Sequence, residues 1–338
     1  MVANADGQRL ISIVIPAYNE EGNIARLESE LLAAVGGLPY RFEFIVIDNH
    51  STDGTGGLVK ALCARDPRWK YIRFSRNFTV EMSMTAGYHF AAGDAIVVLY
   101  SDLQDPPEVI PRLVEKWEEG YDVVYGLRTV RTGDPAWRNA SVKVAYRLIN
   151  WFSDVPIPKD AGDFRLISRQ VRDALNQCEE SNRYMRGMIA WLGFNQIGVL
   201  YERRPRRSGH SKAPFWPTLF FTFNAICSFS LKPLRLFIFF GFAMVVASVL
   251  GILVYTALYF TGSPPPGITT LIVLSFFAIG INSLGIGILG EYLGRTFIEV
   301  KRRPLYLTEE MVNMTPNGPR PGPPGRVDAA AALEHTKG

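Results

Sequence analysis

Two long runs without a charged residue constrain the fold of this chain most strongly. They cover Leu236–Phe260, 25 residues, and Ile268–Leu289, 22 residues. As helices they would be about 37 and 33 Å long, which is enough to cross a hydrocarbon core of roughly 30 Å. Helices buried in a soluble core rarely lack charge over such a length. We therefore interpret the runs as two membrane spans, with predicted bounds 235–261 and 268–290.

The rest of the chain has the composition of a soluble protein. All 36 basic and 32 acidic residues lie outside the two runs. The composition therefore excludes a fully soluble protein, a disordered chain and a transporter with many spans. Three scattered cysteines without a CxxC pair argue against a disulfide framework or a zinc site and fit a reducing compartment. The net charge of +4 is modest, and we expect no nucleic-acid partner.

Charge around the two runs predicts the orientation of the anchor. The intervening loop, TGSPPPG, is uncharged, whereas the outer flanks carry Lys232, Arg235, Arg295, Lys301, Arg302 and Arg303. Because basic flanks stay on the cytoplasmic side, both flanks and the soluble part of the chain should be cytoplasmic. We predict a multi-pass protein of the inner (plasma) membrane with a hairpin anchor and a basic juxtamembrane segment at 291–304.

Strands and helices alternate at the start of the chain. Short apolar runs predict strands at 10–16, 42–47, 69–74 and 95–100, and apolar residues at helical spacing predict helices at 23–35, 58–65 and 80–92. This alternation indicates crossover units in a mostly parallel sheet. The pattern is less regular between 126 and 201, where we predict helices at 168–178 and 182–194.

The remaining segments complete the predicted organisation. We expect a disordered N-terminus at 1–9, an α/β domain at 10–212 and a mostly disordered tail at 305–338, which is rich in Pro, Gly and Ala. Residues 213–232 are aromatic but broken by prolines and polar residues. They predict an amphipathic helix lying in the membrane interface.

Polar clusters follow three of the predicted strands. They are PAYNEE at 16–21, DNHSTDGT at 48–55 and SDLQDPPE at 101–108. A later basic set comprises Arg128, Arg131, Arg138, Arg203, Arg204, Arg206, Arg207 and Lys212. Each cluster alone could be a turn or a lipid-facing charge. Together, acids that bind a hard cation and arginines that bind phosphate suit a nucleotide-diphosphate substrate at the carboxyl edge of the sheet.

The motifs IVIPAYNEE, VIDNHSTDGT, SDLQDPPE, AGDFRLISR and RSGHSK resemble those of the family-two inverting glycosyltransferases. More narrowly, the chain resembles the polyisoprenyl-phosphate glycosyltransferases, which include bactoprenol glucosyltransferases and dolichol-phosphate mannose synthases. The likeness covers roughly 10–305 and includes the two apolar runs. It implies an α/β fold of the GT-A type with a mostly parallel sheet, followed by the interfacial helix and a two-helix transmembrane hairpin.

The resemblance assigns roles position by position. It places Pro16, Tyr18, Glu20, Asp48, Ser101 and Arg128 around the nucleotide sugar, with Asp48 accepting a hydrogen bond from the base. It gives Asp102 and Gln104 to a Mg²⁺ or Mn²⁺ ion that bridges the diphosphate. Asp102 and Asp163 would be the catalytic residues. The phosphate of the acceptor would meet Arg131, Arg138, Arg203, Arg206, Ser211 and Lys212.

Two positions depart from the family pattern. Tyr100 stands where the family usually has the first acid of Asp-x-Asp, and Asn49 stands in place of the second acid after the second strand. The Gln-x-x-Arg-Trp pattern of processive synthases is absent, since Arg186 and Trp191 have the wrong spacing. We therefore expect a single transfer, with metal binding retained through Asp102.

The expected activity is transfer of one sugar from UDP-glucose or a related UDP-sugar to polyisoprenyl (undecaprenyl) phosphate in cell-envelope glycan modification. A phosphate monoester is largely dianionic at neutral pH, so it can attack without a general base. Two alternatives stay open: a GDP-mannose-dependent mannosyltransferase, and a catalytically weak membrane scaffold on the same fold. The membrane is an expected partner, and a homo-oligomer is compatible with the sequence.

Overall fold

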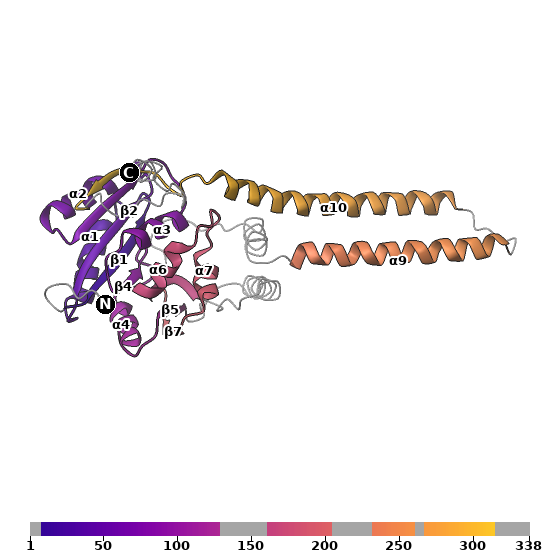
Figure 1. Ribbon diagram of the computed structural model, residues 1–338. Helices are drawn as coiled ribbons and strands as arrows, with labels where there is room; N and C mark the ends of the chain where they lie inside the picture. Colours follow the sequence, from indigo (N-terminus) through magenta and orange to yellow (C-terminus); the bar gives the residue numbers. More distant parts are fainter. Residues whose placement is uncertain (1–7, 129–160, 205–231, 261–266, 315–338) are drawn as a thin grey trace, which may run out of the picture. The chain divides into compact units, whose positions relative to one another are not determined.

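The computed structural model describes residues 8–128, 161–204, 232–260 and 267–314 (Figure 1). Contacts within the chain divide it into two compact units. The first comprises 1–135, 157–212 and 302–338 and holds the sheet. The second comprises 136–156 and 213–301 and holds the two long apolar helices.

An eight-stranded sheet forms the first unit, in the order β7-β5-β6-β4-β1-β2-β3-β8. The strands are β1 Leu10–Ala17, β2 Arg41–Asp48, β3 Trp69–Phe74, β4 Ala95–Val98, β5 Val123–Arg128, β6 Ala161–Ser168, β7 Gln196–Tyr201 and β8 Thr308–Val312. Parallel pairs join β1 to β2, β1 to β4, β2 to β3 and β5 to β7, whereas β6 and β8 pair antiparallel with their neighbours.

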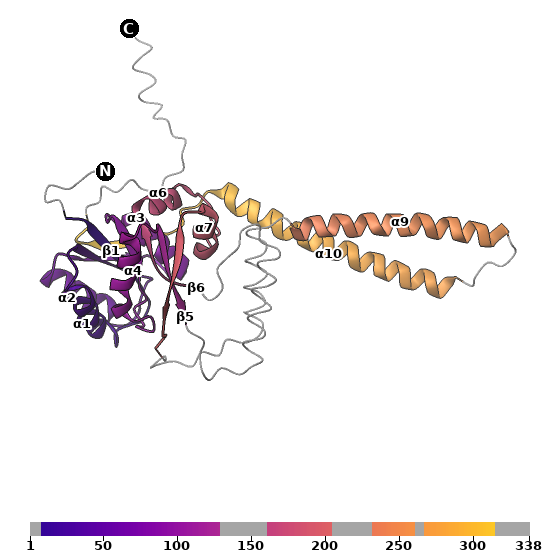
Figure 2. The ribbon, with the colours of Figure 1, turned by 90° about the horizontal axis from the view of Figure 1, so that it is seen from below.

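Helices cover both faces of the sheet. They are α1 Ile24–Val35, α2 Thr55–Arg65, α3 Val80–Phe90, the short 3₁₀ helix η1 Pro107–Val109, α4 Ile110–Glu118, α6 Arg169–Gln177 and α7 Met185–Leu192. Contacts link α1 with α2 and α4, and link α6 with α3 and α7. Figure 2 shows α1 and α2 on one side of the sheet and α3 and α6 on the other. This arrangement explains why the central strands are apolar on both faces.

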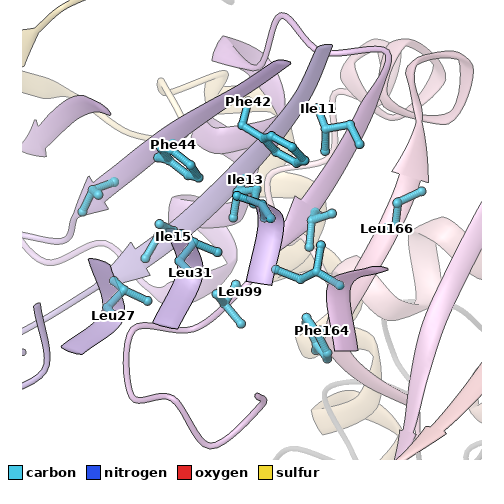
Figure 3. Packing of buried hydrophobic residues seen from close by; sticks show 14 of the residues in the cluster. Ile11, Ile13, Ile15, Leu27, Leu31, Phe42, Phe44, Leu99, Phe164 and Leu166 are labelled. Carbon is cyan, nitrogen blue, oxygen red and sulfur yellow. The ribbon is translucent and has the colours of Figure 1, made fainter. Parts of the chain in front are cut away.

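Alternate residues of β1 serve the two helical layers. Ile11, Ile13 and Ile15 belong to one buried core with Leu27 and Leu31 of α1 (Figure 3). The opposite face of β1 packs so closely on α3 that a Cβ on Gly87 would lie 2.0 Å from Val14 Cγ1. A side chain at Gly87 would therefore separate α3 from β1, and α3 contributes to the cavity described below.

The sequence-based expectations hold for the first hundred residues and need two corrections beyond them. The four predicted strands and three predicted helices are present within a few residues of their expected bounds. The sheet, however, is mixed rather than mostly parallel, because β6 lies antiparallel between β4 and β5. The strands β5, β6 and β7 were not predicted; β6, AGDFRLIS, carries charged residues that interrupt its apolar pattern. The helices predicted at 168–178 and 182–194 correspond to α6 and α7.

The expectation of a mostly disordered tail at 305–338 is also incomplete. Residues 308–312 form β8, which pairs antiparallel with β3 at the edge of the sheet. Its sequence, TEEMV, has two acidic residues and no apolar alternation, and edge strands commonly carry such charge. The remainder, 315–338, and the N-terminal residues 1–7 lie outside the described part of the chain.

Two long helices represent the second unit, α9 Lys232–Phe260 and α10 Ile268–Lys301. They contact each other, and a Cβ on Gly285 would fall within 1.8 Å of the Phe237 ring. Among the described residues, one stretch, Phe277–Lys301, is long and apolar enough to cross a membrane, with a mean hydropathy of 1.3. The predicted juxtamembrane segment 291–304 is helical as far as Lys301, and the predicted interfacial helix at 213–232 lies outside the described residues except for Lys232.

Candidate functional site

A cavity of about 320 Å³ opens at the carboxyl ends of β1, β2 and β4. Its lining comprises Pro16, Ala17, Tyr18, Glu20, Asn49, Val80, Ser83, Tyr100, Ser101, Asp102 and Arg203. Open α/β sheets bind ligands at this edge, because the connections after parallel strands leave a crevice there. Four of the six predicted nucleotide-sugar residues, Pro16, Tyr18, Glu20 and Ser101, thus meet in one cavity, although their roles stay predictions.

Hydrogen bonds between the strand ends hold the walls of this cavity together. The buried Ser101 hydroxyl donates to the Pro16 carbonyl at 3.0 Å, and the Asn49 amide donates to the Ala17 carbonyl at 2.9 Å. Asn19 adopts a left-handed backbone with φ 53°, and its amide donates to Ser51 Oγ at 2.9 Å. The loops after β1, β2 and β4 therefore position one another.

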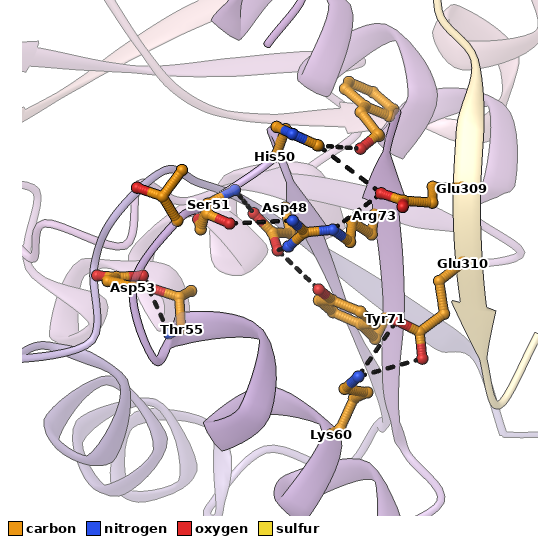
Figure 4. A network of polar contacts seen from close by, with 12 residues as sticks. Asp48, His50, Ser51, Asp53, Thr55, Lys60, Tyr71, Arg73, Glu309 and Glu310 are labelled. Carbon is orange, nitrogen blue, oxygen red and sulfur yellow. Dashed lines mark hydrogen bonds and ion pairs between the residues drawn. The ribbon is translucent and has the colours of Figure 1, made fainter. Parts of the chain in front are cut away.

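Asp48 lies at the end of β2, and its carboxylate is already bonded within the protein. It is fully buried and accepts hydrogen bonds from the Tyr71 hydroxyl at 2.6 Å, Arg73 Nη1 at 3.0 Å and the Ser51 amide at 2.7 Å (Figure 4). Asp48 is not among the lining residues of the cavity. Its predicted contact with the base stays a prediction, and the structure gives it three partners that sequence reasoning did not foresee.

Asp102 lies on the wall of the cavity with a half-buried side chain. Its Oδ1 atom accepts one hydrogen bond, from the Gln104 amide at 3.2 Å. The intervening Leu103 has φ 53°, a left-handed backbone that is unusual for a bulky residue. Such strain, of order 1–3 kcal/mol, is found mainly at functional sites. The tight turn directs the carboxylate of Asp102 to the cavity.

Gln104, the second predicted metal ligand, has a different environment. It is buried, with 4% of its surface exposed, and it is not among the lining residues. Its carbonyl accepts a hydrogen bond from the Arg204 amide at 2.9 Å, which ties the loop after β4 to the segment after β7. Its role at a metal therefore stays a prediction.

A buried carboxylate that the sequence analysis did not single out lies beside two of the predicted arginines. Asp105 is fully buried and accepts a hydrogen bond from the Tyr201 hydroxyl. Its Oδ1 lies 3.7 Å from Arg128 Nη2 and 3.4 Å from Arg203 Nε. Asp105 therefore gathers both guanidinium groups beside the loop that bears Asp102.

Arg203 is the one predicted acceptor residue that the structure describes. Its side chain lines the same cavity as Asp102. Burial lowers its pKa, and the nearby positive charge of Arg128 lowers it further. A cation confined in this way would gain from an anionic ligand. Arg131, Arg138, Arg206, Ser211 and Lys212 lie outside the described residues, so their predicted roles stay predictions.

Asp163 is held by an arginine that sequence reasoning noted only for its spacing to Trp191. Arg186 Nε and Nη2 donate to the two carboxylate oxygens at 2.7 and 2.6 Å, and the Tyr100 hydroxyl donates to Oδ2 at 3.0 Å. Burial alone would raise the pKa of Asp163, but the hydrogen bonds and charge of Arg186 lower it to about 2. Asp163 is therefore an ionised carboxylate at neutral pH and a weak base.

The departure at Tyr100 has a structural partner. Its ring lines the cavity while its hydroxyl bonds Asp163. Burial, followed by the charge of Asp163, raises the pKa of Tyr100 well above its usual range, so the hydroxyl keeps its proton. Tyr100 consequently links the loop after β4 to β6.

Comparisons with known proteins identify the family. Residues 12–175 match the sequence family described as glycosyl transferase family 2. The chain is 38% identical to an uncharacterised glycosyltransferase of Synechocystis over 89% of this chain and 95% of that protein. It is 36% identical to a prophage-derived bactoprenol glucosyl transferase of Shigella flexneri over 89% of this chain and 97% of that protein. The chain belongs to glycosyl transferase family 2.

This member of glycosyl transferase family 2 is thus a glycosyltransferase, as the resemblance implied. Among solved structures, it is similar to glucosyl-3-phosphoglycerate synthase from Mycobacterium tuberculosis in complex with Mn²⁺, UDP-glucose and phosphoglyceric acid. The identity is 20%, the coverage 65% of this chain and 78% of that one, and the TM-score 0.42.

Asp102 offers a divalent ion a half-buried carboxylate on the wall of the cavity. Among the described residues, no group of three or more His, Cys, Asp or Glu side chains could hold a metal by itself. Mg²⁺ is commonly held by one or two carboxylates, water and substrate phosphates rather than by a protein cage. Asp102, with one protein donor on one oxygen and a place on the cavity wall, fits that mode.

Proposed function

We propose that this glycosyltransferase moves one sugar from a nucleotide-diphospho-sugar, UDP-glucose or a related UDP-sugar, to polyisoprenyl (undecaprenyl) phosphate. The observation that carries the proposal is the cavity at the strand ends, which both Asp102 and Arg203 line. A carboxylate for a bridging cation beside a guanidinium for phosphate suits a diphosphate. The bactoprenol glucosyl transferases similar to this chain support a polyprenyl-phosphate acceptor.

The residues that line the cavity have different roles in the transfer. We assign Arg203 to the diphosphate, rather than to the acceptor phosphate that the resemblance implies, because it lines the same cavity as Asp102. Tyr18, Glu20 and Asn49 form the part of the lining that would hold the nucleotide. Asp102 would hold Mg²⁺ or Mn²⁺, and the ion would supply stabilisation of the charge that develops on the departing diphosphate. These interactions align the anomeric carbon with the attacking oxygen, and holding two reactants in a productive geometry lowers the barrier.

Asp163 orients the reactants rather than removing a proton. Its pKa of about 2 makes it a weak base, and the dianionic phosphate of the acceptor attacks without losing a proton to the protein. The oxygen of the lipid phosphate forms the new bond to the anomeric carbon as the bond to the nucleoside diphosphate breaks. Arg186 keeps Asp163 ionised through this step.

Transfer to undecaprenyl phosphate by the purified protein tests this proposal. The protein is incubated with undecaprenyl phosphate, a divalent metal and radiolabelled UDP-glucose, UDP-galactose, UDP-N-acetylglucosamine or GDP-mannose, and label is counted in the lipid fraction. We expect label from a UDP-sugar. Label from GDP-mannose alone would replace the proposed donor with the mannosyl alternative, and label from none of the four would contradict the proposal.

We also propose that α9 and α10 anchor the enzyme as a transmembrane hairpin of the inner membrane, with the catalytic unit in the cytoplasm. An acceptor with a long apolar tail stays in the bilayer, which gives the enzyme a reason for such an anchor. A cysteine at Ser263, in the loop between the helices, should react with an impermeant thiol reagent in intact cells. Protection of that cysteine, with labelling of the C-terminal tail, would reverse the orientation.

A further inference from the structure

The strand that follows α10, β8, contacts the polar network formed by Arg73 and Asp48 near the cavity. β8 pairs with β3, Tyr306 is buried and stacks on Phe74 with ring centroids 5.2 Å apart, and the Ser75 amide donates to the Leu307 carbonyl at 3.0 Å. At the far end, Asn313 Nδ2 donates to the carbonyls of Cys63 and Trp69 at 2.8 and 2.9 Å. Contacts at both ends thus fix residues 306–313 on the sheet.

Glu309 of β8 contacts the arginine that organises the loop after β2 (Figure 4). Its Oε2 accepts from Arg73 Nε at 3.0 Å. The other two nitrogens of that guanidinium donate to Asp48 Oδ2 at 3.0 Å and to the Ser51 carbonyl at 3.1 Å. All three nitrogens of Arg73 are thus engaged, and Glu309 holds one side of the planar fork.

The loop held by Arg73 reaches the cavity. Ser51 Oγ accepts from the amide of Asn19, whose neighbours Tyr18 and Glu20 line the cavity. Asn49, which also lines it, lies between Asp48 and His50. His50 has a left-handed backbone with φ 65°, and its Nδ1 lies 3.7 Å from Glu309 Oε2. The strained part of the loop is thus in contact with β8.

We infer that Glu309 is a positioning residue for the nucleotide-sugar site, acting through Arg73 on the loop formed by residues 48–51. The inference rests on the proposed function, because it assumes that the cavity binds the donor. It makes β8, which begins seven residues after the end of α10, a working part of the catalytic unit. The chain on both sides of the apolar helices then contributes to one site.

The chain offers a matched control on the same strand. Glu310 also forms an ion pair, with Lys60 at 3.2 Å, but Lys60 is exposed and has no bond to the loop. We compare Glu309→Gln with Glu310→Gln in the full-length protein in detergent. UDP-glucose binding is measured by calorimetry without acceptor, and thermal unfolding is recorded for both variants.

The ion pair of Glu309 is half exposed, so its loss should have a moderate effect. We expect Glu309→Gln to weaken UDP-glucose binding about fivefold, which corresponds to roughly 1 kcal/mol. The turnover number and the KM for undecaprenyl phosphate should stay within about twofold of the wild type. Glu310→Gln should bind UDP-glucose normally. Equal weakening in both variants, or no weakening in either, would overturn the inference.

Hydrogen exchange supplies a readout that needs no ligand. The amides of Asn19 and Ser51 are bonded to Ser51 Oγ and Asp48, so they should exchange faster in Glu309→Gln than in Glu310→Gln or the wild type. Unchanged exchange in Glu309→Gln would overturn the positioning role. If the wild type bound no nucleotide sugar while these amides still responded, the proposed donor would be wrong and the role of Glu309 in ordering the loop would stand.

Discussion

Asp48 and Asp102 follow neighbouring parts of the same sheet edge, but their surroundings differ. Asp48 is fully buried and accepts three hydrogen bonds from the protein. Asp102 is half-buried, lines the cavity and accepts one. A carboxylate that is bonded on every side fixes its neighbours, whereas one with a single donor can bind a ligand. Two carboxylates at one edge of the sheet therefore differ in what is open to them: Asp48 is bonded within the protein, and Asp102 faces a cavity.

Asp163 lies between these extremes. Its side chain is 14% exposed, whereas that of Asp48 is fully buried, and it borders the cavity through Tyr100. Its charge is matched by the two-pronged contact of Arg186, which keeps it ionised. The three carboxylates should therefore differ in whether a change at each one alters turnover, nucleotide binding or the stability of the folded protein.

Neutralising Asp102 should have the largest effect on activity. Asp102→Asn removes the negative charge on the cavity wall that would hold a divalent ion, and stabilisation of a leaving diphosphate by such an ion is worth several kcal/mol. We expect turnover to fall by at least about a hundredfold, with no rescue by excess Mg²⁺ or Mn²⁺. Near-normal turnover of Asp102→Asn, or of the wild type in a chelator, would contradict the proposed difference, in which Asp102, unlike Asp48, binds a metal ion.

The control for this prediction is another half-buried carboxylate on the same unit. Asp66, after α2, pairs with the exposed Arg68 at 2.7 Å and is not among the residues that line the cavity. Asp66→Asn should retain turnover within about twofold, because surface ion pairs contribute little. A large loss in Asp66→Asn would mean that general destabilisation explains both variants.

Asp163 should contribute to the pH dependence of the free energy of unfolding at low pH. Its pKa is lowered from 3.8 to about 2 in the folded protein. The ionised group therefore stabilises the fold above the unfolded-state pKa, and this contribution is lost as the pH falls through about 2. The shift corresponds to roughly 2 kcal/mol. In urea unfolding, the wild type should lose this much more stability between about pH 4 and 2 than Asp163→Asn does.

The exposed Asp173 provides the matched comparison for this measurement. Its side chain is half exposed and pairs only with the adjacent Arg172 among the interactions described for it. Asp173→Asn should follow the pH profile of the wild type. Parallel profiles for the wild type and Asp163→Asn would show that the Arg186 pair does not stabilise the folded protein.

The first half of the sheet was predictable because its strands are short apolar runs separated by amphipathic helices. The second half was less so, since the charges in β6 and the acids in β8 hide strands whose partners are far away in sequence. For the site, the motifs identified Asp102 and the lining residues Tyr18 and Glu20. The motifs gave no indication of ion pairs between residues that are distant in sequence and meet only in the folded protein.

Arg186 illustrates that limit. It lies 23 residues after Asp163, and no local pattern links the two. Arg73 offered a better signal, because a lone arginine near the carboxyl end of the apolar strand WKYIRF suggests a buried partner. Glu309 could not have been paired with it from sequence, since 236 residues separate them.

Variants of Arg203 and Arg204 test whether the arginine that lines the cavity binds the phosphates of the nucleotide sugar. Arg203 lines the cavity, whereas its neighbour Arg204 pairs with Glu30 and Glu108 at 2.6 and 2.7 Å. We expect Arg203→Gln to raise the KM for the nucleotide sugar about tenfold, which is the loss of one charged hydrogen bond. Arg204→Gln should change it less than twofold. A larger effect of Arg203→Gln on the lipid acceptor would restore its predicted place at the acceptor phosphate.

The smallest effect is expected at Asp48. Tyr71→Phe removes one donor from its carboxylate while Arg73 and the Ser51 amide remain. Loss of one such bond should lower stability by about 1 kcal/mol. Binding of UDP-glucose should stay within about twofold, because Arg73, and not Tyr71, holds the loop that reaches the cavity. Weaker UDP-glucose binding by Tyr71→Phe, with an unchanged free energy of unfolding, would contradict this expectation. It would indicate that the Asp48 carboxylate bonds the base of the nucleotide rather than stabilising the folded protein.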